Sequence, residues 1–258
     1  MKRAEINLCG LVAVRARWRR DPASILRLFF DLETGKRVGV ISRALAANRK
    51  VYRCVETAEL ERIADTVHHG GIVAVVAEPV LETPKPAQIL AWVRHREPLL
   101  LLDRIGNAHN LGALARTAAF FGVRNIVIPA HPQAAIPNDA AYRISEGGLE
   151  ALQVWRVSDL AAFARDLAQA GYQVIGAATR GGETLRPGTR PKFSKPGTRG
   201  PAPSKPAALI LGNEEHGIAE AMTAACTRLV TLPGGGDVES LNVSVAGALL
   251  MWELLVHR

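Results

Sequence analysis

The chain has 258 residues, of which 48% are hydrophobic, and a formal net charge of +8. That length accommodates two modest domains, each with its own core. No run reaches the roughly 18 apolar residues of a membrane span, and the first residues lack the apolar stretch of a signal peptide, so we expect a cytoplasmic protein without a membrane partner. The cysteines show no metal-ligand spacing, which predicts small buried side chains and no metal site at Cys9, Cys54 and Cys226.

The basic charge is unevenly distributed along the chain. Residues 1–80 hold 14 Lys and Arg against 9 acidic residues, and residues 180–206 hold 7 against 1, so the remainder sums to −3. Basic segments around a near-neutral body favour binding of a polyanion such as RNA. Charge that only keeps the protein in solution is the alternative.

Residues 1–80 alternate short strand-like and helix-like runs, which predicts a small α/β RNA-binding domain. The runs are a strand-like GLVAV, then PASILRLFFDLE, VGVISRALAANRK, VYRCV, TAELERIADTV and IVAVVAEP. Thr57 precedes a helical apolar pattern and is a candidate N-cap. The stretch RARWRR offers arginines for phosphates and a tryptophan for stacking on bases, namely Arg15, Arg17, Trp18, Arg19 and Arg20. An exposed strand end is the alternative for this stretch.

Residues 81–97 contain prolines and mixed charge, which predicts an interdomain linker. Residues 98–258 then repeat a regular pattern. The strand-like runs are LLLLD, NIVIP, QVWRV, YQVIGAAT, AALILG and RLVTLP, and helical patterns such as NLGALARTAAFFG and SDLAAFARDLAQAG lie between most of them. Several runs are continuously apolar, which predicts a parallel, doubly wound α/β sheet covered by helices on both faces. Ligands of such sheets bind beyond the carboxyl ends of the strands.

Residues 183–206 interrupt this pattern. Between Arg186 and Pro206 there are six prolines, three glycines and six basic residues without any acid, a composition that predicts a flexible loop. One interpretation is an arm that contacts RNA through Lys192, Lys195 and Arg199. A tolerated surface insertion is the alternative.

Three loops at strand ends carry polar residues. Asn110 is a candidate N-cap, and Arg116 lies off the apolar stripe of the helix that follows, so its guanidinium can reach back over the Asn110 loop. The loop GNEEHG places carboxylates between two glycines. Three consecutive glycines before Ser240 and Asn242 imply a backbone that another group approaches closely. A phosphate-binding P-loop motif is absent, and the triple glycine is only a near miss of a dinucleotide-binding fingerprint.

Three motifs then occur in register: NLGALARTAAFFGV, LILGNEEHGI and LPGGGDVESLNVSVAGALL. Together they resemble the motifs of the SpoU/TrmH family of RNA ribose 2′-O-methyltransferases, within the SPOUT class. The resemblance covers residues 98–258, and residues 1–80 resemble the ribosomal-protein-like RNA-binding domain of many members. It implies a deep trefoil knot in the parallel sheet domain, S-adenosylmethionine as cofactor, and a homodimer formed through the C-terminal knot helices.

The resemblance also implies the site residues. Five positions match polar residues of the three motifs and are the expected catalytic residues: Asn110, Arg116, Glu214, Ser240 and Asn242. The expected cofactor-binding residues are Gly212, Asn213, Glu214, Gly217, Leu232, Gly234, Gly236, Ser240, Leu241 and Asn242. Glu146 is a looser match, in a glycine-containing turn. Ala108 and Gly234 stand where members usually have proline and methionine, which puts loop rigidity and cofactor fit in question.

The expected reaction is methylation of a ribose 2′-hydroxyl in structured RNA, with ribosomal RNA favoured over transfer RNA. A guanidinium stays protonated in proteins, which favours Arg116 as an orienter of the ribose and a phosphate over the role of general base that the resemblance also implies. A catalytically silent RNA-binding or ribosome-assembly protein with the same knot is the alternative.

Overall fold

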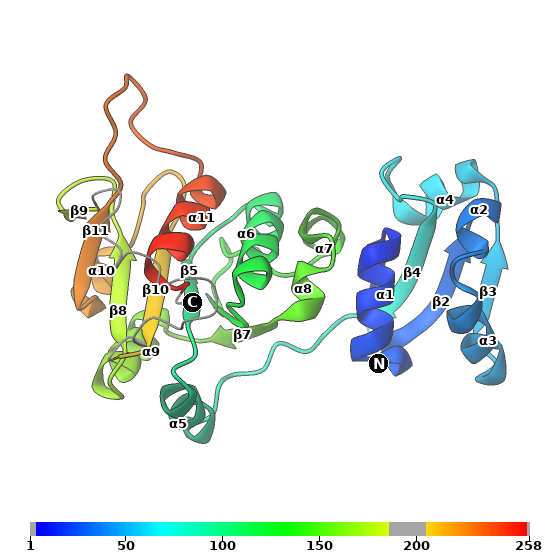
Figure 1. Ribbon diagram of the computed structural model, residues 1–258, viewed down its shortest axis with the longest axis horizontal. Helices are drawn as coiled ribbons and strands as arrows, with labels where there is room; N and C mark the ends of the chain where they lie inside the picture. Colours follow the sequence, from blue (N-terminus) through cyan, green and yellow to red (C-terminus); the bar gives the residue numbers. More distant parts are fainter. Residues whose placement is uncertain (1–3, 186–204, 257–258) are drawn as a thin grey trace, which may run out of the picture.

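A computed structural model describes residues 4–185 and 205–256 of the protein. It contains a four-stranded sheet and a seven-stranded sheet, each with its own helices. The two lie side by side, and helix α1 (Leu11–Arg20) of the smaller part faces α7 (Asp139–Ser145) and α8 (Gly148–Ala151) of the larger part (Figure 1). In the part of the chain that the structure describes, no helix has both the length and the apolar character needed to cross a membrane.

The smaller sheet has the strand order β1-β4-β2-β3, with β4 antiparallel to both β1 and β2 and β2 parallel to β3. Its elements besides α1 are β1 (Glu5–Cys9), the 3₁₀ turn η1 (Pro22–Ser24), β2 (Ile25–Phe30), α2 (Leu32–Gly35), α3 (Gly39–Ala47), β3 (Val51–Cys54), α4 (Thr57–Ala64) and β4 (Ile72–Ala77).

Several local predictions for the smaller part are corrected by the structure. The run GLVAV is not a strand: from Leu11 on it opens α1, because its apolar residues continue into RARWRR with helical spacing and bury Ala13 and Val14. The N-cap of α4 is Glu56, without a side-chain capping bond, and Thr57 is the first helical residue. Cys9 is buried as expected, whereas Cys54 is exposed and Cys226 is partly exposed.

The connection between the two sheets is only partly a linker. Residues 78–85 have no regular structure, but they run along β7 (Gln153–Val157), where the Thr83 hydroxyl donates to the Arg156 carbonyl at 2.8 Å. The rest of the predicted linker folds as helix α5 (Pro86–His95). Trp92 of this helix is 1% exposed and packs edge-on against Trp155, so α5 belongs to the core of the larger part.

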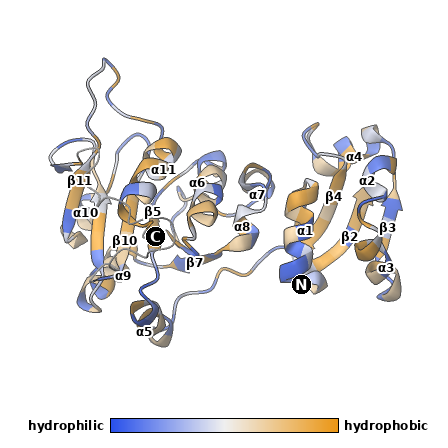
Figure 2. Ribbon diagram, viewed as in Figure 1, coloured by the Kyte–Doolittle hydropathy of each residue, from blue (hydrophilic) through white to orange (hydrophobic). Residues whose placement is uncertain are grey.

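The larger sheet confirms the predicted parallel α/β architecture. Its strand order is β7-β6-β5-β10-β8-β11-β9, and all of its pairings are parallel. The central strands are mostly apolar (Figure 2), as expected for strands covered by helices on both faces. The remaining elements are β5 (Leu99–Asp103), α6 (Ala108–Phe121), β6 (Asn125–Pro129), α9 (Leu160–Gln169), β8 (Gln173–Ala177), β9 (Glu183–Thr184), β10 (Ala207–Gly212), α10 (Glu220–Ala225), β11 (Arg228–Thr231) and α11 (Val243–Leu254).

Helix α11 ends the described chain and packs against α6 and β10. A Cβ atom at Gly247 would lie 2.5 Å from a methyl carbon of Leu114 and 2.8 Å from one of Leu211, so any larger residue would displace these side chains. The chain that follows β10 and β11 thus returns to the middle of the sheet. The trefoil knot implied by the family resemblance stays a prediction.

Candidate active site

Polar side chains from three distant segments meet beyond the carboxyl end of β10. The Asn110 amide donates to Glu214 Oε1 at 2.7 Å, and the Asn242 amide donates to Asn110 Oδ1 at 3.3 Å. Asn110 lies in the first turn of α6, Glu214 in the loop after β10, and Asn242 at the start of α11. The three motifs therefore converge, with Asn110 between the other two.

The start of α6 explains why Asn110 is available for these contacts. The N-cap is Asn107, whose side-chain oxygen accepts from the His109 amide at 2.8 Å, so the prediction that Asn110 caps the helix is wrong. Because another asparagine satisfies the helix end, the Asn110 side chain can bridge two loops. Ala108 is the first helical residue and therefore replaces the family's usual proline at N1, a position where proline is well tolerated.

The loop after β10 is held by its own first residue and by the end of β5. Asn213 accepts from the amides of Glu215 and His216 and donates to the Arg104 carbonyl at 3.0 Å. Asp103 accepts from the Ala219 amide at 2.8 Å and pairs with Arg104 at 2.9 Å, and this pairing raises the pKa of the Arg104 guanidinium. Asp103 and Arg104 were not predicted as site residues from the sequence. The available signal was a charged pair directly after a buried strand.

Contacts and backbone conformation within the protein explain why two positions of this loop are glycine. Gly217 has a φ of 66°, a left-handed conformation that glycine adopts without strain. A side chain at Gly212 would collide with the backbone of Gly217 and Ile218. Both residues therefore shape the loop that presents Glu214.

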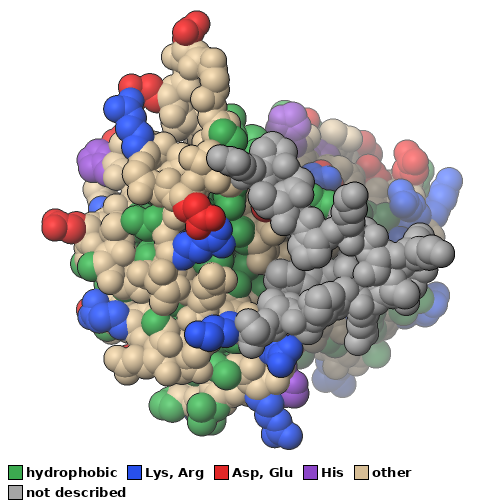
Figure 3. All heavy atoms as spheres, turned by 60° about the vertical axis from the view of Figure 1, so that its left-hand side comes forward, with side chains coloured by type: hydrophobic (Ala, Val, Ile, Leu, Met, Phe, Trp, Pro, Cys, Tyr) green, Lys and Arg blue, Asp and Glu red, His purple; other side chains and the backbone are tan. Residues whose placement is uncertain are grey.

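The loop between β11 and α11, residues 232–242, projects from the molecule (Figures 1 and 3). Asn242 ends it by capping α11, since its side-chain oxygen accepts from the Ser244 amide at 2.8 Å. Leu232 is half-buried, and Ser240 and Leu241 are exposed. Apart from the adjoining residues of the chain, no described atom lies within 4 Å of a Cβ built at Gly234 or Gly236, and neither glycine has a positive φ. Contacts within the described chain therefore do not require these glycines, which fits a backbone that a ligand approaches.

Arg116 points away from the buried face of α6, as predicted, but toward a different partner. Its Nη1 lies 3.0 Å from Glu146 Oε1, and both side chains are more than half exposed. The looser family match at Glu146 is therefore a direct neighbour of the expected catalytic arginine. Within the described residues, Arg116 forms no hydrogen bond or ion pair with the loop of Asn110, contrary to the expectation.

One arginine of α1, Arg17, differs from its predicted role. Arg17 is 6% exposed, and its guanidinium pairs with Glu150 at 2.8 Å, so it cannot face RNA. Arg20 donates to three carbonyl oxygens around α8 but is exposed, so its contact with RNA stays a prediction. Trp18 is partly buried against the core.

Arg15 and Arg19 stay predictions as RNA contacts. Arg15 donates to the Arg37 carbonyl at 3.0 Å, and Arg19 is exposed. The remaining predicted contacts, Lys192, Lys195 and Arg199, lie outside the described residues. Within residues 4–185 and 205–256, no group of three or more His, Cys, Asp or Glu side chains could hold a metal ion.

Sequence models of two families match the chain. The RNA 2′-O ribose methyltransferase substrate binding family matches residues 8–80, and the SpoU rRNA Methylase family matches residues 97–252. With a parallel sheet that carries three converging motifs, these matches define the class of protein as an RNA 2′-O-methyltransferase. More particularly, the chain belongs to the SpoU rRNA Methylase family.

Individual relatives extend over nearly the whole chain. The 23S rRNA (guanosine-2′-O-)-methyltransferase RlmB of Ralstonia nicotianae is 31% identical over 97% of this chain and 95% of its own length. The uncharacterized tRNA/rRNA methyltransferase YfiF of Escherichia coli O157:H7 is 31% identical over 96% of this chain, which spans 67% of that relative. The AdoMet-bound rRNA methyltransferase of Sinorhizobium meliloti superposes with a TM-score of 0.71 at 21% identity, covering 97% of this chain and 88% of that one, and so shares the fold.

Proposed function

We propose that the protein transfers the methyl group of S-adenosylmethionine to a ribose 2′-hydroxyl of structured ribosomal RNA, in the cytoplasm. The observation that carries this proposal is the pair of hydrogen bonds by which Asn110 joins Glu214 and Asn242. Through these bonds all three family motifs border one region beyond the sheet. Ribosomal RNA is favoured over transfer RNA because relatives that match over almost their full length are named for 23S rRNA.

The two loops after β10 and β11 suit the cofactor. Its proposed contacts are Gly212, Asn213, Glu214, Gly217, Leu232, Gly234, Gly236, Ser240, Leu241 and Asn242. The open space beside Gly234 and Gly236 leaves backbone amides and carbonyls accessible to a ligand. Bound there, the cofactor would supply a methyl group activated by an adjacent sulfonium. The AdoMet-bound S. meliloti protein, which has the same fold, supports this choice of ligand.

We assign positioning, more than proton transfer, to the chain's own residues. The Arg116 guanidinium can donate to a ribose oxygen and to an adjacent phosphate, and it stays protonated while doing so. Asn110 and Asn242 fix the loops on either side, Glu214 offers a carboxylate acceptor, and Ser240 supplies a hydroxyl. The 2′-hydroxyl proton then leaves to water or to a phosphate oxygen of the RNA.

We also propose a homodimer in which the partner covers the apolar face of α6 and α11. Four large apolar side chains on these helices are 43–78% exposed: Phe120, Val245, Leu249 and Trp252. A second copy of the chain would remove this surface from water. In sedimentation equilibrium, Leu249→Asp should shift the protein toward the monomer, with Leu90→Asp on the exposed face of α5 as the matched control. Equal mass for wild type and Leu249→Asp would reject this interface.

The proposed activity has a direct test. Mass-spectrometric mapping of ribose methylation in total RNA should lose one site when the gene is deleted and regain it when the gene is restored. Unchanged methylation of every RNA would reject the proposal. Calorimetric titration of the purified protein with S-adenosylmethionine separates the silent alternative, because a folded protein that binds none of the cofactor cannot catalyse the transfer.

A further inference from the structure

One short segment contacts both the N-terminal domain and the helix that carries Arg116. We call residues 146–150 the bridging segment; it comprises the turn after α7 and most of α8. Its first residue, Glu146, pairs with Arg116, and its last residue, Glu150, pairs with Arg17 of α1. Two ion pairs, one at each end, thus connect the substrate-binding side of the molecule to the candidate active site.

Glu146 adopts a conformation that glycine would adopt more easily. Its φ is 43°, in the left-handed region where a side chain is disfavoured, and it is the C-cap of α7. The Glu146 and Arg116 side chains are 60% and 57% exposed, and ion pairs so exposed contribute little to stability. A contribution of this ion pair to stability therefore does not explain why residue 146 is a glutamate. Backbone strain of this kind occurs at sites where a side chain has to be held in a particular place.

The middle of the segment lies between α1 and α6, and only its α6 side is tightly packed. Gly147 has a φ of 88° and lies against α1, since a Cβ there would be 3.6 Å from Ala16 Cβ. A Cβ at Gly148 would be 2.7 Å from Arg116 Cα, so α8 rests directly on the backbone of that arginine. The segment therefore has little freedom to move relative to α6, and it lies in ordinary van der Waals range of α1.

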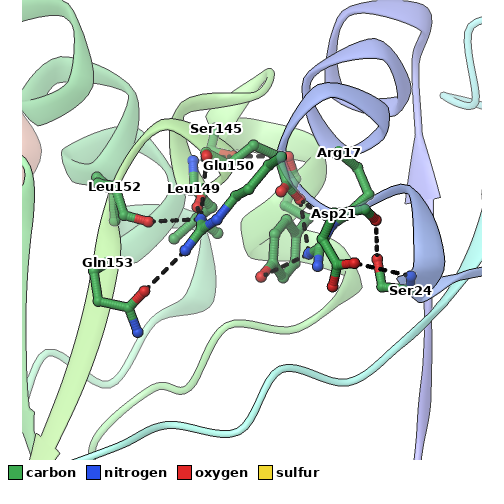
Figure 4. A network of polar contacts seen from close by, with 10 residues as sticks. Arg17, Asp21, Ser24, Ser145, Leu149, Glu150, Leu152 and Gln153 are labelled. Carbon is green, nitrogen blue, oxygen red and sulfur yellow. Dashed lines mark hydrogen bonds and ion pairs between the residues drawn. The ribbon is translucent and has the colours of Figure 1, made fainter.

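The far end of the segment is anchored by arginines of α1 (Figure 4). Arg17 Nε donates to Glu150 Oε1 at 2.9 Å, and the two side chains are 7% and 0% exposed. Arg17 also donates to the Tyr142 hydroxyl at 3.3 Å. Arg20 Nη1 donates to the carbonyl oxygens of Leu149, Glu150 and Leu152 at 2.7–3.1 Å, which satisfies the end of the short helix.

We propose that the bridging segment sets the direction of Arg116 from the N-terminal domain. Glu146 is the positioning residue that orients the guanidinium, and the Arg17–Glu150 pair fixes the turn that presents Glu146. This inference rests on the proposed function, in which Arg116 orients the ribose. RNA held by the N-terminal domain then meets an arginine whose long side chain is already restrained relative to that domain.

The test uses the full chain, S-adenosylmethionine and an RNA fragment that contains the mapped site. Glu146→Gln and Glu146→Gly should lower the single-turnover methylation rate on the order of 10-fold to 100-fold, while the KM for RNA changes by less than about threefold. Glu146→Gly should also raise the melting temperature, because glycine relieves the left-handed strain. A merely structural role predicts no loss of rate in this more stable variant. A wild-type rate in Glu146→Gly, or a loss confined to RNA affinity, would overturn the proposal.

The second arm tests the connection to α1. The double variant Arg17→Met/Glu150→Met replaces the buried pair by apolar side chains of similar length, so it should fold. If the pair acts through Glu146, this double variant should slow methylation, and adding Glu146→Gln should slow it no further. Losses that multiply, or a double variant as fast as wild type, would overturn the connection.

Failure of the inference is distinguishable from failure of the proposed function. Wild type that methylates no RNA with S-adenosylmethionine rejects the function, whereas active wild type with equally active Glu146 variants rejects only the positioning role. Nitrogen-15 relaxation of the Arg116 Nε tests the restraint without any measurement of activity. Its order parameter should fall in Glu146→Gln, and an unchanged value would reject the restraint.

Discussion

The joint between the two domains and the cluster of motif residues use polar side chains in opposite ways. At the joint, the Arg17 and Glu150 side chains are withdrawn from water, and Arg17 donates to Glu150 and to the Tyr142 hydroxyl. At the cluster, two hydrogen bonds connect Asn110, Glu214 and Asn242, and the last two residues are exposed. The joint pairs most of its buried polar groups with one another and withdraws them from water. The cluster keeps polar atoms accessible, which a binding site requires.

Burial also leaves an electrostatic cost at the joint. Desolvation raises the pKa of the Glu150 carboxyl, and the neighbouring Arg17 guanidinium opposes this shift without cancelling it. Within the described residues, Glu150 Oε2 is buried without a hydrogen-bond partner. The joint therefore depends on keeping both members of the pair in place.

Removing one member of the pair should have the largest effect. Arg17→Ala leaves the Glu150 carboxylate buried and unpaired, which should lower the free energy of unfolding by about 3–5 kcal/mol. The double variant Arg17→Met/Glu150→Met should lie near wild type in the same urea unfolding experiment. A loss below about 1 kcal/mol for Arg17→Ala would show that the joint is no more tightly coupled than a surface contact.

In the candidate active site, substitutions of Arg116 are expected to change the methylation rate much more than the stability of the protein. Arg116→Ala and Arg116→Lys should both reduce kcat about 100-fold, equivalent to about 2.7 kcal/mol, since neither retains the planar fork of the guanidinium. The free energy of unfolding should change by less than about 0.5 kcal/mol, because the side chain is exposed. Near wild-type turnover by Arg116→Lys would contradict a need for that fork.

Two glycines allow the comparison to be repeated with one kind of substitution. Gly148→Ala places a Cβ 2.7 Å from Arg116 Cα and should lower the free energy of unfolding by about 1–3 kcal/mol. Gly236→Ala meets no described atom within 4 Å, so stability should stay within about 0.5 kcal/mol of wild type. Calorimetry should instead show weaker S-adenosylmethionine binding by Gly236→Ala. Equal destabilisation by both alanines would remove the distinction.

The smallest expected effect is a pH dependence that belongs to the joint. Because the pKa of Glu150 is raised in the folded protein, its contribution to stability is complete below the ordinary value of 4.5 and is lost as the pH rises through the raised value. Wild type should therefore lose stability relative to Glu150→Gln as the pH increases above 4.5. Urea unfolding at several pH values measures this difference. A difference that grows in the opposite direction would mean that Arg17 outweighs desolvation.

Much of the larger domain could be predicted from local patterns. Continuous apolar runs predicted its parallel strands, and the order of three motifs predicted which loops would meet at Asn110, Glu214 and Asn242. The smaller domain was predicted less well, since GLVAV and RARWRR form one helix. A short apolar run fits a strand or a helix equally well, and neighbouring elements decide between them.

The sequence by itself determined the α/β class, the family and the polar residues of the three motifs, because these depend on periodicity and on residue type at fixed spacing. Only the tertiary structure decided which groups the arginine side chains bind. Arg17 pairs with Glu150 and Arg20 donates to the Leu152 carbonyl, whereas Arg116 pairs with Glu146. The partner of a long charged side chain depends on which distant segment packs beside it, and no local pattern contains that information.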